Sequence, residues 1–166
     1  DMSRGLGDVY KRQIWAYTSG ISFNDLKFTG PESSASRLHR VIDGDTIEAT
    51  VPGYGRERIR LSSIDAPERS QPYGSESTEC LKDILSQGQL TVKPEKTDRY
   101  GRLVASLYVD GERVDVQMVE QGCAWWYSRY SSSPALMKAH FSARFDKRGL
   151  WAASNPVKPE TWRRRN

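Results

Sequence analysis

Short runs of β-forming residues, separated by turn dipeptides, follow one another in the first half of this chain. Candidate strands cover Leu38 to Ile42, Thr46 to Val51 and Arg56 to Ile64. The dipeptides Asp43-Gly44 and Pro52-Gly53 lie between them, and such dipeptides favour tight turns between paired strands. The pattern therefore predicts consecutive antiparallel hairpins rather than a parallel sheet.

The second half alternates helical and extended periods. Helices are predicted over Ser75 to Ser86, Val114 to Gln121 and Pro134 to Arg148, and a glycine lies just past each of them. Further strands are predicted over Leu90 to Val92 and Leu103 to Val109. Five short strands interrupted by three helices predict an α+β fold that is mainly β, a small closed barrel such as the OB-fold.

The composition excludes a membrane-spanning protein and an intrinsically disordered one. Hydrophobic residues make up 37% of the chain and aromatic residues 10%, and no run approaches the roughly 18 apolar residues that a spanning helix needs. The 166 residues suffice for one domain with a real core. The net charge of +4 is mild, and it fits either simple solubility or a polyanionic partner.

The two ends of the chain differ from its centre. Residues 1–13 are predicted to be a translated sequencing adapter, because back-translation of Ser3 to Gln13 reproduces such an adapter in frame; a native disordered arm is the alternative. The native N-terminus is then expected to be missing. Residues 14–35 are turn-rich and polar and are predicted to form a linker. Residues 36–152 form the predicted domain, and residues 153–166 form a basic tail that either is solvated or contacts nucleic acid.

Carboxylates and an arginine gather at two strand ends where folding alone does not require them. Asp43 and Asp45 flank the first predicted turn, although an ordinary hairpin turn explains Asp43 equally well. Arg60, Asp65 and Glu68 surround the end of the third strand. A solvated loop with an intrastrand ion pair is the alternative for this second group.

A third cluster, Thr97 to Arg102, precedes a strand and offers Arg102 as a fork for phosphate. Together the clusters describe a phosphodiester site. Two carboxylates and a carbonyl oxygen suit a hard cation such as Ca²⁺, a third carboxylate can activate water, and two guanidiniums can neutralise phosphate charge. Zinc is excluded because His39 and His140 have no ligand spacing to a cysteine, and no GxSxG motif supports a serine nucleophile.

Five ordered motifs make the sequence resemble the staphylococcal nuclease (thermonuclease) family, in its bacterial branch. They are VIDGDTIEA, RIRLSSIDAPE, TDRYGRLVASLYVDG, EQGCAWWY, and AR followed by RGLW, between about Arg40 and Trp151. The resemblance implies a five-stranded OB-fold barrel with three helices. It also implies a Ca²⁺-dependent nuclease that cuts DNA and RNA without sequence preference.

The resemblance assigns roles residue by residue. It makes Asp45 and Asp65 metal ligands together with the carbonyl oxygen of Ala66, and it makes Asp43 their outer neighbour. The implied catalytic residues are Glu68, Arg60 and Arg102, and the implied nucleotide-binding residues are Arg99, Tyr100 and either Tyr127 or Tyr130. Ala66 stands where the family often has a hydroxyl residue, but a carbonyl ligand does not depend on the side chain.

Further expectations follow from the same resemblance. The substrates are DNA and RNA, with single-stranded or denatured forms preferred, and the protein is a monomer that is exported and has no membrane partner. Judged from the residues alone, at least one of Trp125 and Trp126 is expected to pack in the core or at the barrel mouth. Cys80 lies on the first predicted helix and Cys123 follows the second, so the two could pair, but free buried thiols are the favoured interpretation because a single pair gives no disulfide framework.

Two other function classes remain as alternatives. One is a catalytically inactive, nuclease-like OB-fold module that binds nucleic acid. The presence of Asp45, Asp65, Glu68, Arg60 and Arg102 together argues against such decay. The other is a protein-interaction OB-fold, which gives no reason for two guanidiniums to accompany three carboxylates.

Overall fold

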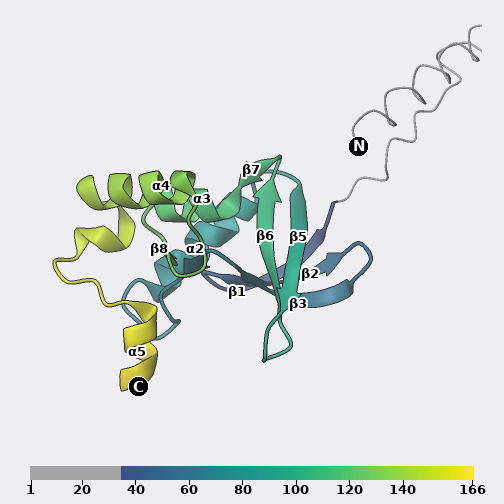
Figure 1. The fold of residues 1–166 in the computed structure, drawn as a ribbon, viewed down its shortest axis with the longest axis horizontal. Helices are drawn as coiled ribbons and strands as arrows, with labels where there is room; N and C mark the ends of the chain where they lie inside the picture. The colour runs from purple at the N-terminus through teal and green to yellow at the C-terminus, as the bar shows by residue number, and fades with distance from the viewer. Residues whose placement is uncertain (1–34) are drawn as a thin grey trace, which may run out of the picture. The chain divides into compact units, whose positions relative to one another are not determined.

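The computed structural model describes residues 35–166 and contains a curved mixed sheet (Figure 1). Its strands lie in the order β1-β2-β3-β6-β5, with β7 beside β6. The pairs β1–β2, β2–β3 and β5–β6 are antiparallel, whereas β3 and β6 are parallel. The strand bounds are β1 Arg37–Asp43, β2 Thr46–Val51, β3 Gly55–Leu61, β4 Ile64–Asp65, β5 Leu90–Thr97, β6 Leu103–Val109, β7 Glu112–Arg113 and β8 Trp125–Trp126.

Four α-helices lie to one side of the sheet (Figure 1): α2 Gly74–Leu85, α3 Val114–Glu120, α4 Pro134–Phe145 and α5 Pro159–Arg165, with a 3-10 turn η1 at Gly149–Ala152. The predicted α+β, mainly β class is confirmed. The predicted strand from Arg56 to Ile64 is interrupted, because β3 ends at Leu61 and Ile64 belongs to β4, which pairs with β8 in a separate two-stranded sheet. Two further differences concern the tail and the closure of the barrel. A fourth helix, α5, forms within the basic tail, and the barrel is not closed by a continuous ladder. Among the described residues, β1 and β5 meet through one isolated bridge, Ala35 with Thr91, and a hydrogen bond from Ser36 N to Leu90 O of 2.8 Å.

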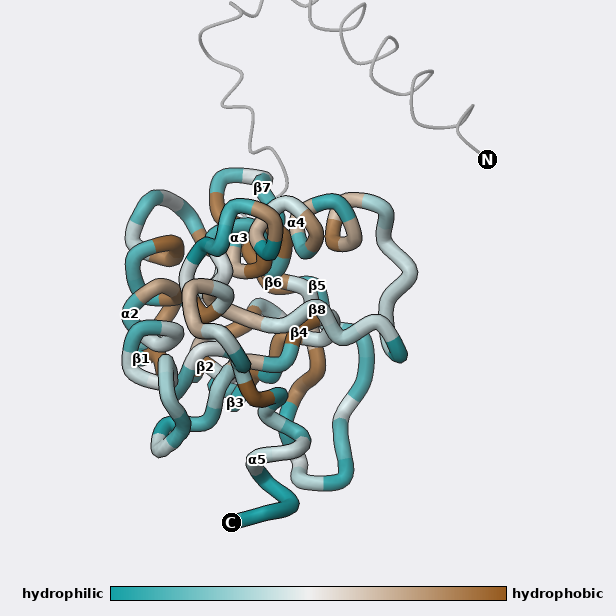
Figure 2. Tube along the Cα trace, turned by 90° about the vertical axis from the view of Figure 1, so that its left-hand side faces the viewer, coloured by the Kyte–Doolittle hydropathy of each residue, from teal (hydrophilic) through white to brown (hydrophobic). Residues whose placement is uncertain are grey.

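The core lies between the sheet and helices α2 and α3. Apolar segments gather in this region, whereas α5 is hydrophilic (Figure 2). Its largest fully buried side chains include Ile47, Ile59, Leu81, Leu107 and Met118. Burying a side chain of this size stabilises a fold by about 1.5–3 kcal/mol. This core fixes β1, β2 and β3 against α2, and the candidate site is built on their ends.

Two further expectations from the sequence concern the N-terminal segment and membrane-spanning helices. The predicted adapter and most of the predicted linker, residues 1–34, lie outside the described residues. None of the helices within residues 35–166 has the length and hydropathy needed to cross a membrane.

Cys80 on α2 and Cys123 after α3 form a disulfide, with a Cα–Cα distance of 6.4 Å. The expectation of two free thiols is therefore wrong. The reason is tertiary: α2 and α3 pack together and bring the two cysteines, 43 positions apart, within the range that a disulfide spans.

Reducing this disulfide should lower the stability of the fold. In the chain-entropy description, closing a loop of this length stabilises a domain by about 4 kcal/mol, so the urea midpoint should fall when the protein is unfolded in the presence of dithiothreitol. The double variant Cys80→Ser/Cys123→Ser serves as the control, because dithiothreitol should not change its midpoint. Equal midpoints for oxidised and reduced wild-type protein would contradict the prediction.

Candidate active site

The turn between β1 and β2 carries the first two carboxylates. Its centre, Gly44, packs so closely on α2 that an added Cβ would lie 2.0 Å from Ser77 Oγ, which fixes the turn against the helix. The backbone N–H of Asp45 donates to Asp43 Oδ1 at 3.1 Å. Burial, reinforced by the negative charge of Asp45, raises the pKa of Asp43 to about 6. The turn thus places two carboxylates beside each other in a partly buried position.

Strand β4 and the loop after it bring the next carboxylates to the same place. The N–H of Ala66 donates to Asp45 Oδ2 at 2.8 Å, which ties this loop to the β1–β2 turn. Asp65 is buried and pairs with Trp125 of β8, and burial raises the pKa of its carboxyl. Glu68 follows Pro67 and is more exposed; its backbone N–H donates to Gln71 Oε1 at 3.1 Å. The predicted metal ligands Asp45, Asp65 and Ala66 therefore do lie together.

Arg60 of β3 stands between the two carboxylates. Its Nη2 lies 3.3 Å from Asp45 Oδ2 and 3.3 Å from Asp65 Oδ1. Its Nη1 donates to the carbonyl oxygens of Ile64 at 2.8 Å and of Leu61 at 2.5 Å. Arg60 therefore also holds the chain between β3 and β4 in place, a role that the motif alone does not indicate.

Arg102 is oriented by its own loop. Its Nε donates to Asp98 Oδ2 at 2.7 Å, and its backbone N–H donates to Asp98 Oδ1 at 3.0 Å. Gly101 has φ +75°, which suits glycine and turns the chain back toward Asp98. Desolvation is the largest single influence and raises the pKa of Asp98, but the hydrogen bonds from Arg102 and Tyr100 together outweigh it, so the pKa is lowered from its usual value. Asp98 therefore orients the Arg102 side chain, a contact that the sequence reasoning did not single out.

An open cavity of about 890 Å³ brings most of the predicted residues together. Of the predicted set, its lining includes Asp43, Asp45, Arg60, Glu68, Arg99, Tyr100, Arg102, Tyr127 and Tyr130. Both tyrosine candidates face this cavity, and their rings pack edge to face with centroids 4.6 Å apart. Asp65 and Ala66 do not line it.

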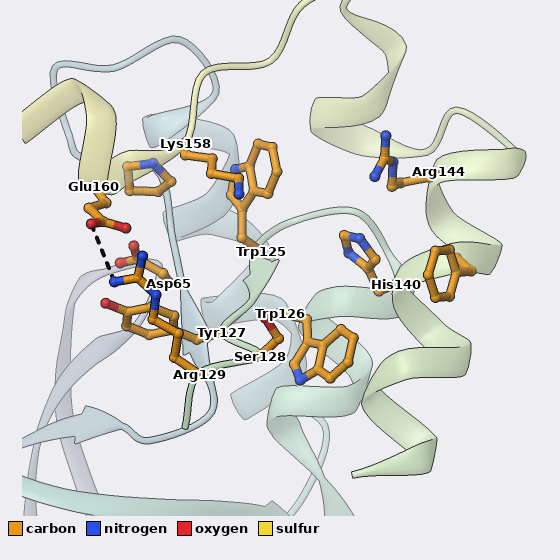
Figure 3. Close-up of a pocket in the computed structure, with 12 residues that line it drawn as sticks. Asp65, Trp125, Trp126, Tyr127, Ser128, Arg129, His140, Arg144, Lys158 and Glu160 are labelled. Carbon is orange, nitrogen blue, oxygen red and sulfur yellow. Dashed lines mark ion pairs between the residues drawn. The ribbon is translucent and has the colours of Figure 1, made fainter. Parts of the chain in front are cut away.

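Asp65 instead lines a smaller pocket of about 260 Å³ between β8, α4 and the start of α5 (Figure 3). Trp125 and Trp126 form part of its wall, and Trp125 packs edge to face on Trp151 with centroids 4.4 Å apart. His140 also lies here, and burial followed by the charges of Arg144 and Lys158 lowers its pKa. The packing role expected for at least one of the tryptophans is confirmed by the Trp125–Trp151 contact.

Arg163 of α5 is a second residue at the site to which the sequence assigned no role of its own. Its Nη1 and Nη2 lie 3.1 Å from Asp65 Oδ1 and Oδ2 respectively, and Nη1 donates to Glu68 Oε1 at 2.7 Å. The tail sequence holds three consecutive arginines, Arg163 to Arg165. Nothing in their local pattern indicates which one turns toward the carboxylates.

Comparisons with known proteins identify the family of this chain. The sequence model of the family described as "Staphylococcal nuclease homologue" matches residues 58–153. A protein named "Uncharacterized endonuclease" from Haemophilus influenzae is 36% identical over 94% of this chain and 88% of its own length, and one with the same name from Escherichia coli is 44% identical over 78% and 84%. A "Probable staphylococcal-like nuclease CAN1" from Oryza sativa is 48% identical over 64% of this chain, but over 32% of its own length. The chain therefore belongs to the staphylococcal nuclease family.

Proposed function

We propose that this protein is a Ca²⁺-dependent nuclease that hydrolyses phosphodiester bonds of DNA and RNA without sequence preference. The observation that carries the proposal is the cluster of Asp45, Asp65 and Arg60 at one edge of a cavity whose lining includes Glu68 and Arg102. Hydrolysis of a phosphodiester passes through a pentavalent phosphorus whose oxygens carry negative charge. A cation held by carboxylates and guanidiniums that bind phosphate can both stabilise that charge. The endonuclease and nuclease names of the relatives support the same reaction class.

The donor atoms fit a hard cation. Within residues 35–166 no three His, Cys, Asp or Glu side chains are grouped so that they could hold a metal by themselves. The proposed metal site needs only two such side chains, those of Asp45 and Asp65. The carbonyl oxygen of Ala66 is the third protein ligand, and Ca²⁺ readily completes its coordination shell with water. Asp65 already attracts a cation, since the Arg163 guanidinium contacts both of its oxygens. All-oxygen ligands favour Ca²⁺ or Mg²⁺ over zinc.

In the proposed hydrolysis each residue of the site would have a separate role. When bound, Ca²⁺ lowers the pKa of water and neutralises charge on the phosphate. Glu68 positions the attacking water and accepts its proton, while Arg60 and Arg102 donate to the phosphate oxygens as their charge grows. Asp43 supports the neighbouring Asp45 through the 3.1 Å backbone hydrogen bond. The ester oxygen that leaves takes up a proton from solvent.

Arg99 and three tyrosines could bind a nucleotide strand in the cavity. Arg99 and Tyr100 lie together, with Arg99 Nη2 donating to the Tyr100 hydroxyl at 2.6 Å, and both are at the cavity. Tyr127 and Tyr130 supply aromatic faces there. Stacking on aromatic faces is tolerant of sequence and favours unpaired bases, so denatured DNA and single-stranded RNA are the preferred substrates in this proposal.

The compartment and the oligomeric state belong to the same proposal. The Cys80–Cys123 disulfide supports an oxidising compartment, because disulfides are rare in reducing ones. We therefore propose that the protein is exported, and the family resemblance adds the proposal that it acts as a monomer.

Hydrolysis of denatured DNA in the presence of Ca²⁺, and again with EGTA, tests the proposal. Hydrolysis with Ca²⁺ and none with EGTA is expected. Other divalent ions should bind without equivalent turnover, because the site must hold the metal and still leave room for water and a phosphate oxygen. Binding of DNA without hydrolysis under every metal would instead favour the catalytically inactive binding module.

Replacing Arg102 with lysine should lower turnover far more than substrate binding. Removing one donor aimed at developing charge costs about 10²- to 10³-fold in rate, and lysine lacks the planar fork that Asp98 orients. Single-turnover rates and KM separate the two effects. Arg56→Lys is the matched control, because Arg56 pairs with Glu48 on the exposed part of β3 and should keep the wild-type rate.

Arg60→Lys should be at least as damaging, since Arg60 also holds the chain after β3 through two backbone carbonyls. Variants with lysine at position 60 or 102 that retain the wild-type rate would remove the arginines from the proposed mechanism.

A further inference from the structure

The C-terminal helix α5 places a cation of this chain on two carboxylates that the proposed reaction uses. Arg163 contacts both oxygens of Asp65, each at 3.1 Å, and Glu68 Oε1 at 2.7 Å. These partners lie 98 and 95 positions earlier in the sequence. A planar guanidinium is well matched to such two-oxygen contacts.

Further contacts dock the segment that carries Arg163. Gln71 Nε2 donates to the carbonyl oxygen of Val157 at 2.6 Å. Pro159 is fully buried, and Lys158 Nζ lies 5.8 Å from the centre of a Trp125 ring. Glu160 pairs with Arg129 at 3.7 Å, as the dashed line in Figure 3 marks. The position of α5 is therefore set by packing as well as by the ion pairs.

Arg163 and a metal cation would compete for the same oxygens. Both carboxylate oxygens of Asp65 are engaged by the guanidinium, and the Asp65 side chain is only 5% exposed, so water screens the site weakly. A divalent cation on Asp65 would face the positive charge of Arg163 at short range, which is unfavourable for both. Glu68, proposed to position the water, is engaged by the same guanidinium.

We propose that α5 is an autoinhibitory element, in which Arg163 occupies Asp65 and Glu68 in the metal-free protein and leaves when the metal binds. The inference rests on the proposed function. Removing Arg163 removes the competitor, so metal binding becomes tighter. Couplings of this kind typically change an affinity by about 5- to 150-fold.

The test compares full-length Arg163→Ala and Arg163→Gln with wild-type protein. Arg165→Ala is the matched control, because it removes the same charge from the same exposed end of α5 and leaves the pairs of Arg163 intact. Calorimetric titration with Ca²⁺ alone, without nucleic acid, is expected to give a dissociation constant about 5- to 150-fold lower for both Arg163 variants and unchanged for Arg165→Ala. Equal or weaker Ca²⁺ binding by both Arg163 variants would overturn the inference.

A second readout follows the helix itself. Amide hydrogen exchange in residues 159–165 of the wild-type protein is expected to speed up when Ca²⁺ is added, because α5 then loses the ion pairs of Arg163. The same variant Arg163→Ala has no such pairs to lose, so an equal acceleration by Ca²⁺ in Arg163→Ala would overturn the inference. The results of these experiments distinguish failure of the autoinhibition inference from failure of the proposed nuclease function. A wild-type protein that hydrolyses DNA with Ca²⁺, together with Arg163 variants of unchanged affinity, keeps the function and rejects autoinhibition. Absence of Ca²⁺ binding and hydrolysis in every variant rejects both.

Discussion

Replacing Asp45 with asparagine should abolish nuclease activity while the fold is retained. Asparagine keeps an oxygen that can accept the hydrogen bond from Ala66 N–H, which Asp45 accepts at 2.8 Å, but it removes the charge proposed to hold Ca²⁺. Turnover should fall below detection. Ca²⁺ affinity should fall by more than the roughly 10- to 100-fold that loss of an outer partner of a metal site costs. Calorimetry and rates measured over a series of Ca²⁺ concentrations check both effects.

Asp45→Ala should give the same loss with an added cost in stability, because the N–H of Ala66 would lose its acceptor in a buried place. Asp83→Asn on the exposed surface of α2 is the control for removing one negative charge. Near wild-type rates of Asp45→Asn at modest Ca²⁺ would show that the metal assignment is wrong.

Glu68→Gln should lower the rate by about 10²- to 10⁴-fold, the range in which general acid–base catalysis contributes, with Ca²⁺ binding retained. An amide can still contact water but cannot accept its proton. Glu68→Asp should also be slow, because the shorter side chain moves the water. Rates and Ca²⁺ affinity have to be measured side by side, since a parallel loss of affinity would make Glu68 a metal ligand instead.

The contact between Glu68 and Arg163 requires one more comparison. Because Glu68→Gln also weakens the hold on α5, the substitution should be repeated in the Arg163→Ala background, where that contact is already absent. The drop in rate should be the same in both backgrounds. Glu79→Gln on α2, where Glu79 pairs with Lys82 on the surface, should leave the rate unchanged. A wild-type rate for Glu68→Gln would remove this residue from the mechanism.

The strands and helices were largely predictable because their signals are local. The predicted helix from Ser75 to Ser86 differs from α2 by one residue at each end, and the predicted strand from Thr46 to Val51 coincides with β2. Alternation of apolar and polar residues, with glycine at the ends, depends only on neighbours in the sequence. The helix α5 was missed because a run of charged residues gives no apolar period.

The sequence by itself determined which residue types this protein brings to its site. Asp43, Asp45, Arg60, Glu68 and Arg102 lie in short motifs at strand ends, and neighbouring strands bring such ends to one edge of a sheet, where all five line one cavity. Their proximity follows from chain order and strand pairing.

Only the tertiary structure decided which distant groups meet. It joined Cys80 to Cys123, turned Tyr127 and Tyr130 toward the same cavity, and selected Arg163 from three adjacent arginines to contact Asp65 and Glu68. Contacts between residues far apart in the chain depend on how all the helices and strands pack at once. A local pattern therefore cannot specify them, whereas the packing of α2 on α3 and the docking of α5 do.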